Sequence, residues 1–324
     1  MITIGFDMGM GALKLWSKGG GLQLVSQVAN NGRAHLADGI VGMKSRKRAT
    51  LVQGDFGSFY VGSAAHEHGR PVENLDFDRL TGAPEMRVLL YAALAQYQDE
   101  HGPFDEALSL MVGLPLQMMT GDGAKEYQRG VKGWLMSTHD FTVDGISHRI
   151  EVESVRQTAQ PVGALFDYVL DDKGQILGDH GSVLREEVGV ISVGFNTVEL
   201  LVVKEQGAVE RFTRGNTLGV RRLLELINQD GLYSLGELDG ILRGGGLRSD
   251  VKSALPIWSR EVNGEIEKVW GVSHKRFAKV LIVGGGALLL KEMLTLQFGH
   301  KAWLPNDPVL SIAHGLWKLS TMKR

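Results

Sequence analysis

Two glycine-rich turns carry the residue types that phosphate chemistry needs. The first, Gly5-Phe-Asp-Met-Gly-Met-Gly11, lies between two apolar runs and is followed by Lys14. The backbone amides of such a turn point outward and form an anion-binding concavity, and glycine lets a ligand approach the backbone closely. Asp7 is suited to hold the water shell of Mg²⁺, and Lys14 supplies a point charge for phosphate. We therefore predict phosphate contacts at Gly9, Met10 and Gly11.

The second turn, Ser192-Val-Gly-Phe-Asn-Thr197, has a similar setting in the second half of the chain. Gly194 aligns with Gly9, and apolar runs flank both turns. Two similar strand–turn–strand units indicate a duplicated core with a cleft between its halves, where small ligands usually bind. The alternative is an accidental likeness between two glycine hairpins. Duplication adds four candidate contacts: Gly194, Phe195, Asn196 and Thr197.

A third glycine cluster, Leu281-Ile-Val-Gly-Gly-Gly-Ala287, ends an apolar run and opens a leucine-rich helix. Amides at the start of a helix suit a phosphate or the face of a base, so Gly284, Gly285 and Gly286 are further candidates. Other nucleotide motifs do not fit. Gly9-x-Gly11 lacks the third glycine of a dinucleotide fingerprint and precedes a strand, and the sequence has no Walker-type lysine motif.

The elements that position these turns alternate between strands and helices, which indicates the α/β class. We expect a meander of three strands at the start, over Ile2–Phe6, Ala12–Trp16 and Leu22–Val28. Further strands are expected over Leu108–Val112, Val188–Val193, Val198–Val203 and Val280–Val283, with hairpins around Gly57 and over Phe141–Val152. Helices are expected over Glu85–Tyr97, Pro161–Val169, Arg221–Gln229 and Val309–Leu319. Polar turns after Val169 place a domain boundary near residue 170.

Composition limits the function classes that remain. The 324 residues exceed the usual size of one hydrophobic core, and a net charge of −2 gives no general attraction to nucleic acid or anionic membranes. The absence of cysteine excludes disulfides, thiolate zinc sites, iron–sulfur ligation and cysteine nucleophiles. Neither a signal peptide nor an apolar run of about 20 residues is present. We therefore expect a cytoplasmic protein that contacts neither membrane nor nucleic acid directly.

Taken in order, the motifs resemble the actin-like ATPase superfamily, and within it the prokaryotic ParM/StbA-type plasmid-segregation actins and their archaeal and phage relatives. Phe59-Tyr-Val-Gly-Ser-Ala64 and Gly113-Leu-Pro115 are also typical of these small members. The resemblance runs from Ile4 to Leu319. It implies a duplicated, ribonuclease H-like α/β fold whose two domains flank a cleft for ATP (or GTP) and Mg²⁺.

The same resemblance implies a domain organisation and partners. The first domain covers residues 1–170, with a small subdomain over about 30–80, and the second covers 171–308. The closing helix, over 309–324, packs back on the first domain. The protein polymerises with itself, hydrolyses ATP, and segregates plasmid or phage DNA through a DNA-binding adaptor protein.

Gln160 is the residue that the resemblance assigns to catalysis, together with Asp7. A glutamine at the start of the helix between the domains orients the attacking water; Gln157 is a nearby competitor. The resemblance also exposes a departure, because the second turn of these proteins usually opens with aspartate and this chain has Ser192. We therefore expect nucleotide binding with slow hydrolysis. Glu199 is a candidate to compensate for the lost charge.

Two other functions stay open. A small-metabolite or sugar kinase shares the superfamily, and a non-filamentous nucleotide-binding scaffold would be consistent with Ser192. The basic run Lys44–Arg48 is interpreted as a solvated loop, with a filament or acidic-partner contact as the alternative. His66-x-His68 lacks a third ligand, so we predict no histidine metal site.

Overall fold

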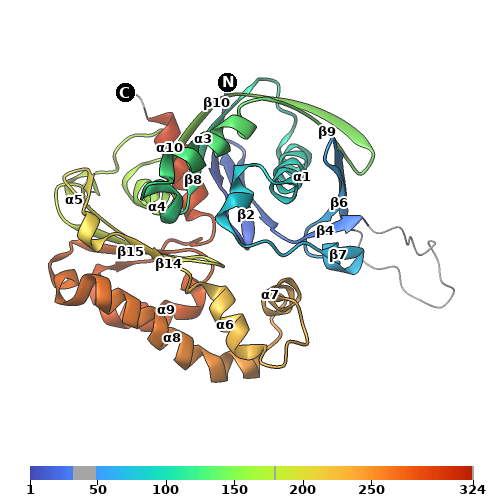
Figure 1. Ribbon diagram of the computed structural model, residues 1–324. Coiled ribbons are helices and arrows are strands. Elements are labelled where there is room, and N and C mark those ends of the chain that lie inside the picture. The colour runs from blue at the N-terminus through green and yellow to red at the C-terminus, as the bar shows by residue number, and fades with distance from the viewer. Residues whose placement is uncertain (32–48, 179, 323–324) are drawn as a thin grey trace.

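The computed structural model describes residues 1–31, 49–178 and 180–322, and the chain forms two α/β domains built on two separate sheets (Figure 1). The α/β class with two domains is therefore confirmed. The basic run Lys44–Arg48 lies outside the described residues. We keep residue 170 as the proposed boundary between the domains.

The first domain is built on a ten-stranded sheet in the described residues, with the order β3-β2-β1-β8-β10-β9-β5-β6-β4-β7. Its strands are β1 (Ile2–Asp7), β2 (Ala12–Ser17), β3 (Gly20–Val25), β4 (Val28–Asn31), β5 (Thr50–Gly54), β6 (Gly57–Val61), β7 (Gly69–Pro71), β8 (Leu108–Leu114), β9 (Thr138–Val143) and β10 (Ile146–Ala159). The antiparallel β1–β2–β3 ladder confirms the meander.

The expected third strand, Leu22–Val28, is wrong at its end. β3 stops at Val25, and Val28 begins β4, which pairs with β6. The break arises because Ser26 donates its amide to the Gly11 carbonyl (3.1 Å) and its hydroxyl to the Gly9 carbonyl (3.0 Å). The polar pair Ser26 and Gln27 thus leaves the ladder, and Ser26 braces the first glycine turn.

Over the part of the chain that the structure describes, the second domain is built on a six-stranded sheet with the order β13-β12-β11-β15-β16, and β14 pairs with β12. Its strands are β11 (Val188–Val193), β12 (Val198–Lys204), β13 (Gly207–Ala208), β14 (Arg214–Asn216), β15 (Lys279–Val283) and β16 (Ala302–Trp303). β11 and β12 are buried almost along their whole length, as their continuous apolar runs require.

The two sheets contain the same unit, which supports the duplication. In the first, β1 pairs antiparallel with β2 and parallel with β8, and Asp7 lies opposite Lys14. In the second, β11 pairs antiparallel with β12 and parallel with β15, and Ser192 lies opposite Glu199. The register therefore makes Ser192 the counterpart of Asp7, and Glu199 the counterpart of Lys14.

Helices cover both sheets (Figure 1). They are α1 (Pro84–His101), α2 (Leu116–Met119), α3 (Ala124–Leu135), α4 (Gln160–Val169), α5 (His180–Val183), α6 (Val220–Ile227), α7 (Leu235–Arg243), α8 (Arg248–Trp270), α9 (Ala287–Phe298) and α10 (Ser311–Thr321), with short 3-10 turns η1 (Ala65–Glu67), η2 (Phe77–Thr81), η3 (Glu210–Phe212), η4 (Gly271–Arg276) and η5 (Gly299–Lys301). Each domain has its own apolar core, and a third cluster lies around α4 and α10, where the domains join.

α4 and α10 cross at very short range. A Cβ on Gly315 would lie 1.8 Å from the Gly163 carbonyl oxygen, so only glycine permits this approach. Asp167 on α4 accepts hydrogen bonds from Ser311 (2.6 Å) and Lys318 (2.9 Å) on α10. The last helix also packs on β1 and β2, so it returns to the first domain. Over the three described stretches, no helix has both the length and the apolar character to cross a bilayer.

Candidate functional site

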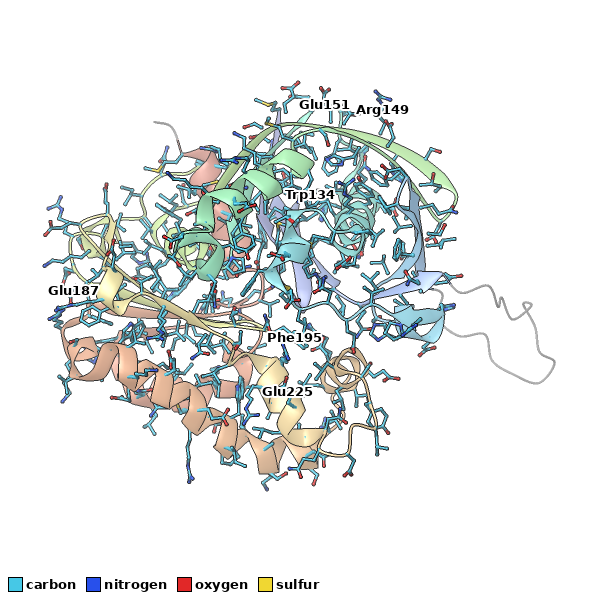
Figure 2. All side chains as sticks on the ribbon, viewed as in Figure 1. Trp134, Arg149, Glu151, Glu187, Phe195 and Glu225 are labelled. Atoms are coloured by element: carbon cyan, nitrogen blue, oxygen red, sulfur yellow. The ribbon has the colours of Figure 1, made fainter. Side chains whose placement is uncertain are left out.

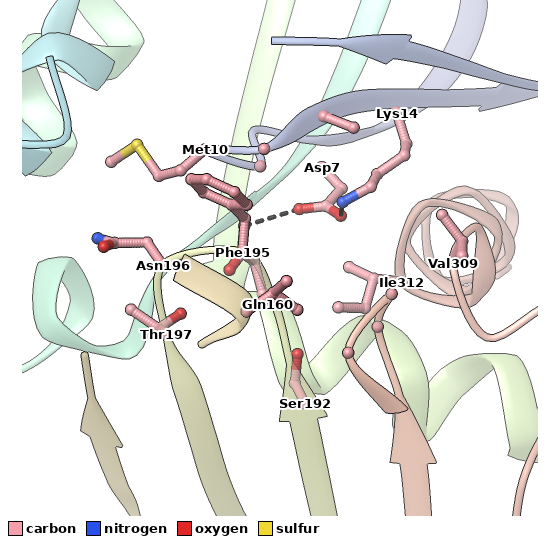
Figure 3. Close-up of a pocket in the computed structure, with 18 of the residues that line it drawn as sticks. Asp7, Met10, Lys14, Gln160, Ser192, Phe195, Asn196, Thr197, Val309 and Ile312 are labelled. Atoms are coloured by element: carbon pink, nitrogen blue, oxygen red, sulfur yellow. Dashed lines mark hydrogen bonds and ion pairs between the residues drawn. The ribbon is translucent and has the colours of Figure 1, made fainter. Parts of the chain in front are cut away.

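A cavity of about 280 Å³ lies between the two domains and is lined by all of the predicted site residues (Figure 3). From the first domain come Asp7, Gly9, Met10, Gly11 and Lys14, with Gln160 from the start of α4; from the second come Ser192, Gly194, Phe195, Asn196, Thr197, Gly284, Gly285 and Gly286. Except for Lys14, which reaches the cavity from β2, these residues lie at or just beyond the carboxyl ends of β1, β10, β11 and β15, where ligands of such sheets bind.

Asp7 is the polar centre of the cavity. It is 2% exposed, and its two carboxylate oxygens accept hydrogen bonds from Gln160 Nε2 (2.7 Å) and Lys14 Nζ (3.0 Å). Lys14 reaches it across the β1–β2 ladder, and Gln160 reaches it from α4 (Figure 3). One network thus joins the carboxylate predicted to hold Mg²⁺, the lysine predicted to contact phosphate and the amide predicted to orient water.

The competitor Gln157 points elsewhere. Its side-chain amide donates to the Gln128 carbonyl on α3 (3.0 Å), and it does not line the cavity. The geometry therefore favours Gln160 over Gln157 as the residue that orients a ligand or water.

The first two glycine turns are tightly built. A Cβ on Gly9 would lie 2.3 Å from the Ala12 carbonyl oxygen and 2.8 Å from Lys14 Nζ, so a side chain at Gly9 would displace the lysine. In the second turn, Gly194 donates to the Thr197 carbonyl (2.8 Å) and accepts from the Val220 amide (3.0 Å) at the start of α6. Both turns are thus fixed before any ligand arrives.

The three glycines of the third turn have different surroundings. Gly284 has φ +91°, and a Cβ there would lie 2.4 Å from the Val193 carbonyl oxygen. A Cβ on Gly286 would meet the Val193 side chain at 2.4 Å. A Cβ on Gly285 would have no described heavy atom within 4 Å beyond its chain neighbours. Gly284 and Gly286 are therefore required by close packing against Val193, whereas Gly285 faces the open cavity.

Ser192 and Glu199 occupy the positions in the second unit that Asp7 and Lys14 occupy in the first. A hydroxyl group thus replaces the carboxylate, and a carboxyl group replaces the ammonium group. Ser192 lies at the end of β11 and points into the cavity (Figure 3). Glu199 is 1% exposed; its Oε1 accepts the Leu116 amide (2.7 Å), while its Oε2 has no hydrogen-bond partner among the described residues. Burial, assisted by the charge of Asp7, raises the pKa of Glu199 to about 8.

The unpartnered oxygen of Glu199 bears on whether Mg²⁺ fits here. Asp7 and Glu199 are both buried, and the charge of Asp7 favours the protonated form of Glu199, whereas a hydrated divalent cation would favour its ionised form. The donor set, carboxylates with amide and hydroxyl oxygens of Gln160 and Ser192, suits Mg²⁺. No group of three or more histidine, aspartate or glutamate residues with metal-binding geometry occurs in the described chain, so any Mg²⁺ would keep much of its water shell.

Several cavity residues escaped the sequence analysis. Asp239 and Arg243 on α7 form an ion pair (Nε–Oδ2, 2.7 Å), and burial raises the pKa of Asp239. They lie on an ordinary amphipathic helix, so the only sequence signal near them is the capping box of Ser234 and Glu237. The remaining lining residues that were missed are Met8, Ala12, Gln23, Phe77, Pro115, Val220, Leu242, Leu288, Leu289, Val309 and Ile312.

Comparison with known proteins agrees with the resemblance. Residues 5–163 match the family model described as actin like proteins N terminal domain. The protein is a member of the actin-like superfamily. This actin-like chain has no match among the curated proteins.

Solved structures show the same fold over the whole chain. A ParM filament from Clostridium botulinum is 20% identical with a TM-score of 0.75, and covers 98% of each chain. Ta0583, an archaeal actin homologue solved in complex with ADP, is 18% identical with a TM-score of 0.73 and covers 99% of each chain. The actin-like protein Alp7A is 17% identical with a TM-score of 0.73, over 99% of this chain and 96% of its own.

Proposed function

We propose that this actin-like protein binds ATP with Mg²⁺ in the cavity between its domains, assembles into filaments and hydrolyses the nucleotide slowly. The observation that carries the proposal is the meeting of three glycine turns with Asp7, Lys14 and Gln160 in one cavity. The ADP complex of Ta0583 and the ParM filament support nucleotide binding and self-assembly by analogy. GTP is the alternative nucleotide.

Each group has a defined part in this proposal. The amides of the Gly9–Gly11 and Gly194–Thr197 turns bind the phosphates, and Lys14 supplies a positive charge beside them. Asp7, with Glu199 behind it, would hold the water shell of Mg²⁺, which neutralises phosphate charge when bound. The Gln160 amide orients the attacking water, because catalysis of phosphoryl transfer depends mainly on positioning and electrostatics.

Slow hydrolysis follows from Ser192. A serine hydroxyl can hydrogen-bond to a metal-bound water but brings no negative charge, so the cation is held less firmly than by two aspartates. Glu199 offsets part of that loss. Its free Oε2 provides a second carboxylate near Asp7, but from a buried position where the neutral form is favoured.

The cellular role that we propose is segregation of plasmid or phage DNA by the filaments, in the cytoplasm. Since the chain has a net charge of −2, we expect contact with DNA to pass through an adaptor protein instead of the filament itself. The segregation role rests on the resemblance to ParM-type proteins.

Pelleting and light scattering, each with and without ATP and Mg²⁺, test the proposal, with GTP in a parallel sample. Assembly that needs nucleotide and Mg²⁺, followed by phosphate release, is the expected result. Phosphate transfer to a small molecule without assembly would instead indicate a kinase. Nucleotide binding without assembly or turnover would indicate a scaffold, and no binding at all would reject the site.

A further inference from the structure

We propose that Gln27, His66, Glu73 and Gly236 form a cross-cleft latch that must open before nucleotide can leave the cavity. The inference rests on the proposed function, because it concerns exchange of the same nucleotide. The latch joins the first domain to the N-terminus of α7 in the second domain. Figure 1 shows α7 on the side of β4 and β7, away from the α4–α10 junction that links the domains.

Both backbone groups of Gly236 are held by the other domain. Gln27, which is 6% exposed, donates its side-chain amide to the Gly236 carbonyl, and the Glu73 carboxylate accepts the Gly236 amide (2.9 Å). Gly236 belongs to the first turn of α7, where amides have no partner within the helix. A carboxylate at a helix N-terminus is also favoured by the helix dipole. The first domain therefore completes the cap of a helix in the second.

The contact depends on glycine at this position. A Cβ on Gly236 would lie 2.3 Å from His66 Cε1 and 2.9 Å from its Nδ1, so any side chain here would displace the His66 ring or push the two segments apart. His66 fills this space without any hydrogen bond to the described residues at either ring nitrogen. Toward Gly236 itself the contact of His66 is steric, and the two hydrogen bonds to Gly236 supply the attraction.

The latch adjoins the nucleotide cavity. A small cavity of about 40 Å³ lies behind Gln27 and His66, and Gly11, Phe195 and Asp239 line both cavities. Phe195 packs against the cores of both domains and lies between them in Figure 2. A Cβ on Gly11 would be only 2.4 Å from Phe195 Cβ, which makes this a second close contact across the cleft.

The same helix that is latched also walls the cavity. Asp239, Leu242 and Arg243 of α7 line the nucleotide site, two turns or less from Gly236. When the domains separate at this end, both hydrogen bonds to Gly236 must break as α7 moves away from the first domain. The latch should therefore slow nucleotide release in proportion to the strength of these bonds.

Stopped-flow release of a fluorescent ATP analogue from the full chain tests the latch. Gln27→Met keeps the side-chain volume but leaves the Gly236 carbonyl unpaired, and should speed release about tenfold. Glu73→Gln weakens a bond at the exposed rim and should speed release about threefold. The matched controls are Gln53→Met, which removes a glutamine hydrogen bond to Ser58 within the first domain, and Glu100→Gln on α1. Both should match the wild type.

Amide hydrogen exchange of the ligand-free protein separates the latch from the proposed function. Gln27→Met should speed exchange at Gly9–Gly11 and Gly194–Thr197, which an open cleft exposes, whereas Gln53→Met should not. If the wild type binds no nucleotide, the proposed function fails and the exchange result still decides the latch. Unchanged exchange and unchanged release in Gln27→Met would overturn it.

Discussion

Alanine at two neighbouring glycines of the third turn should change the stability of the fold in opposite directions. Gly284 has φ +91°, and its added Cβ would overlap the Val193 carbonyl oxygen at 2.4 Å. Left-handed backbone costs a non-glycine residue about 1–3 kcal/mol, and forced overlap costs a further ~1–3 kcal/mol. Gly284→Ala should therefore lose about 2–6 kcal/mol, which is a fall in Tm of roughly 4–12 °C.

Gly285→Ala should stabilise the fold and weaken the ligand. Gly285 has no positive φ, and its added Cβ meets no described atom within 4 Å. A tolerated Gly→Ala change stabilises by about 0.4–1 kcal/mol through the unfolded state, so Tm should rise by roughly 1–2 °C. The methyl group enters the cavity beside the proposed nucleotide, and the crowding should lower affinity about tenfold.

Thermal unfolding and titration of a fluorescent ATP analogue measure the two effects on the same samples. Gly264→Ala on α8 is the matched control, because its Cβ also meets no described atom and Gly264 does not line the cavity. It should raise Tm without changing affinity. Unchanged affinity in Gly285→Ala would refute the placement of nucleotide against the third turn. A fall in the Tm of Gly285→Ala would refute the inference that the added methyl group has room beside the third turn.

Three further predictions concern the chemistry of the site. Gln160→Ala should lower the rate of phosphate release about a hundredfold, whereas Gln157→Ala, which loses only its bond to Gln128, should stay near the wild-type rate. Ser192→Asp should raise that rate, and an unchanged or lower rate would contradict the account of slow hydrolysis. Because the pKa of Glu199 is raised from 4.5 to about 8, the folded chain holds that proton more tightly, and wild-type stability falls as pH rises through this window. Glu199→Gln should therefore raise the Tm of the ligand-free protein at pH 8.5 and have little effect near pH 4.5.

The sequence predicted the glycine turns that line the cavity better than the other residues of the cavity wall. The glycine turns were found because each residue type has a local reason to be there: Gly9 is crowded by Ala12, and Gly284 needs a positive φ. Asp239 and Arg243 were not found, because an ion pair four residues apart is common on any exposed helix. Only the closure of the second domain on the first makes that helix face part of the cavity.

The end of the third strand shows a similar limit. Apolar alternation predicted one strand through Val28, but Ser26 and Gln27 bond to the first turn and to α7, which are distant in sequence. Such partners cannot be read from periodicity, which reports only which face of a strand is buried. The latch was missed for the same reason, since Gly236 has no unusual φ and is required only by the nearness of His66.

The duplicated register explains why Ser192 does not leave the second half without a carboxylate. Asp7 and Lys14 lie opposite each other in the first unit, and their charges cancel in an ion pair. In the second unit Ser192 replaces the acid and Glu199 stands where the lysine would be, so the carboxyl group lies across the ladder on the neighbouring strand. The side chain of Glu199 is held by the Leu116 amide and keeps one oxygen free. The lysine counterpart that would neutralise an ionised Glu199 is absent from this ladder, and Glu199 is not among the residues that line the cavity. In the ligand-free protein the raised pKa of Glu199 favours its neutral form at neutral pH, so the second unit needs no countercharge, whereas the first unit is balanced by the Asp7–Lys14 ion pair.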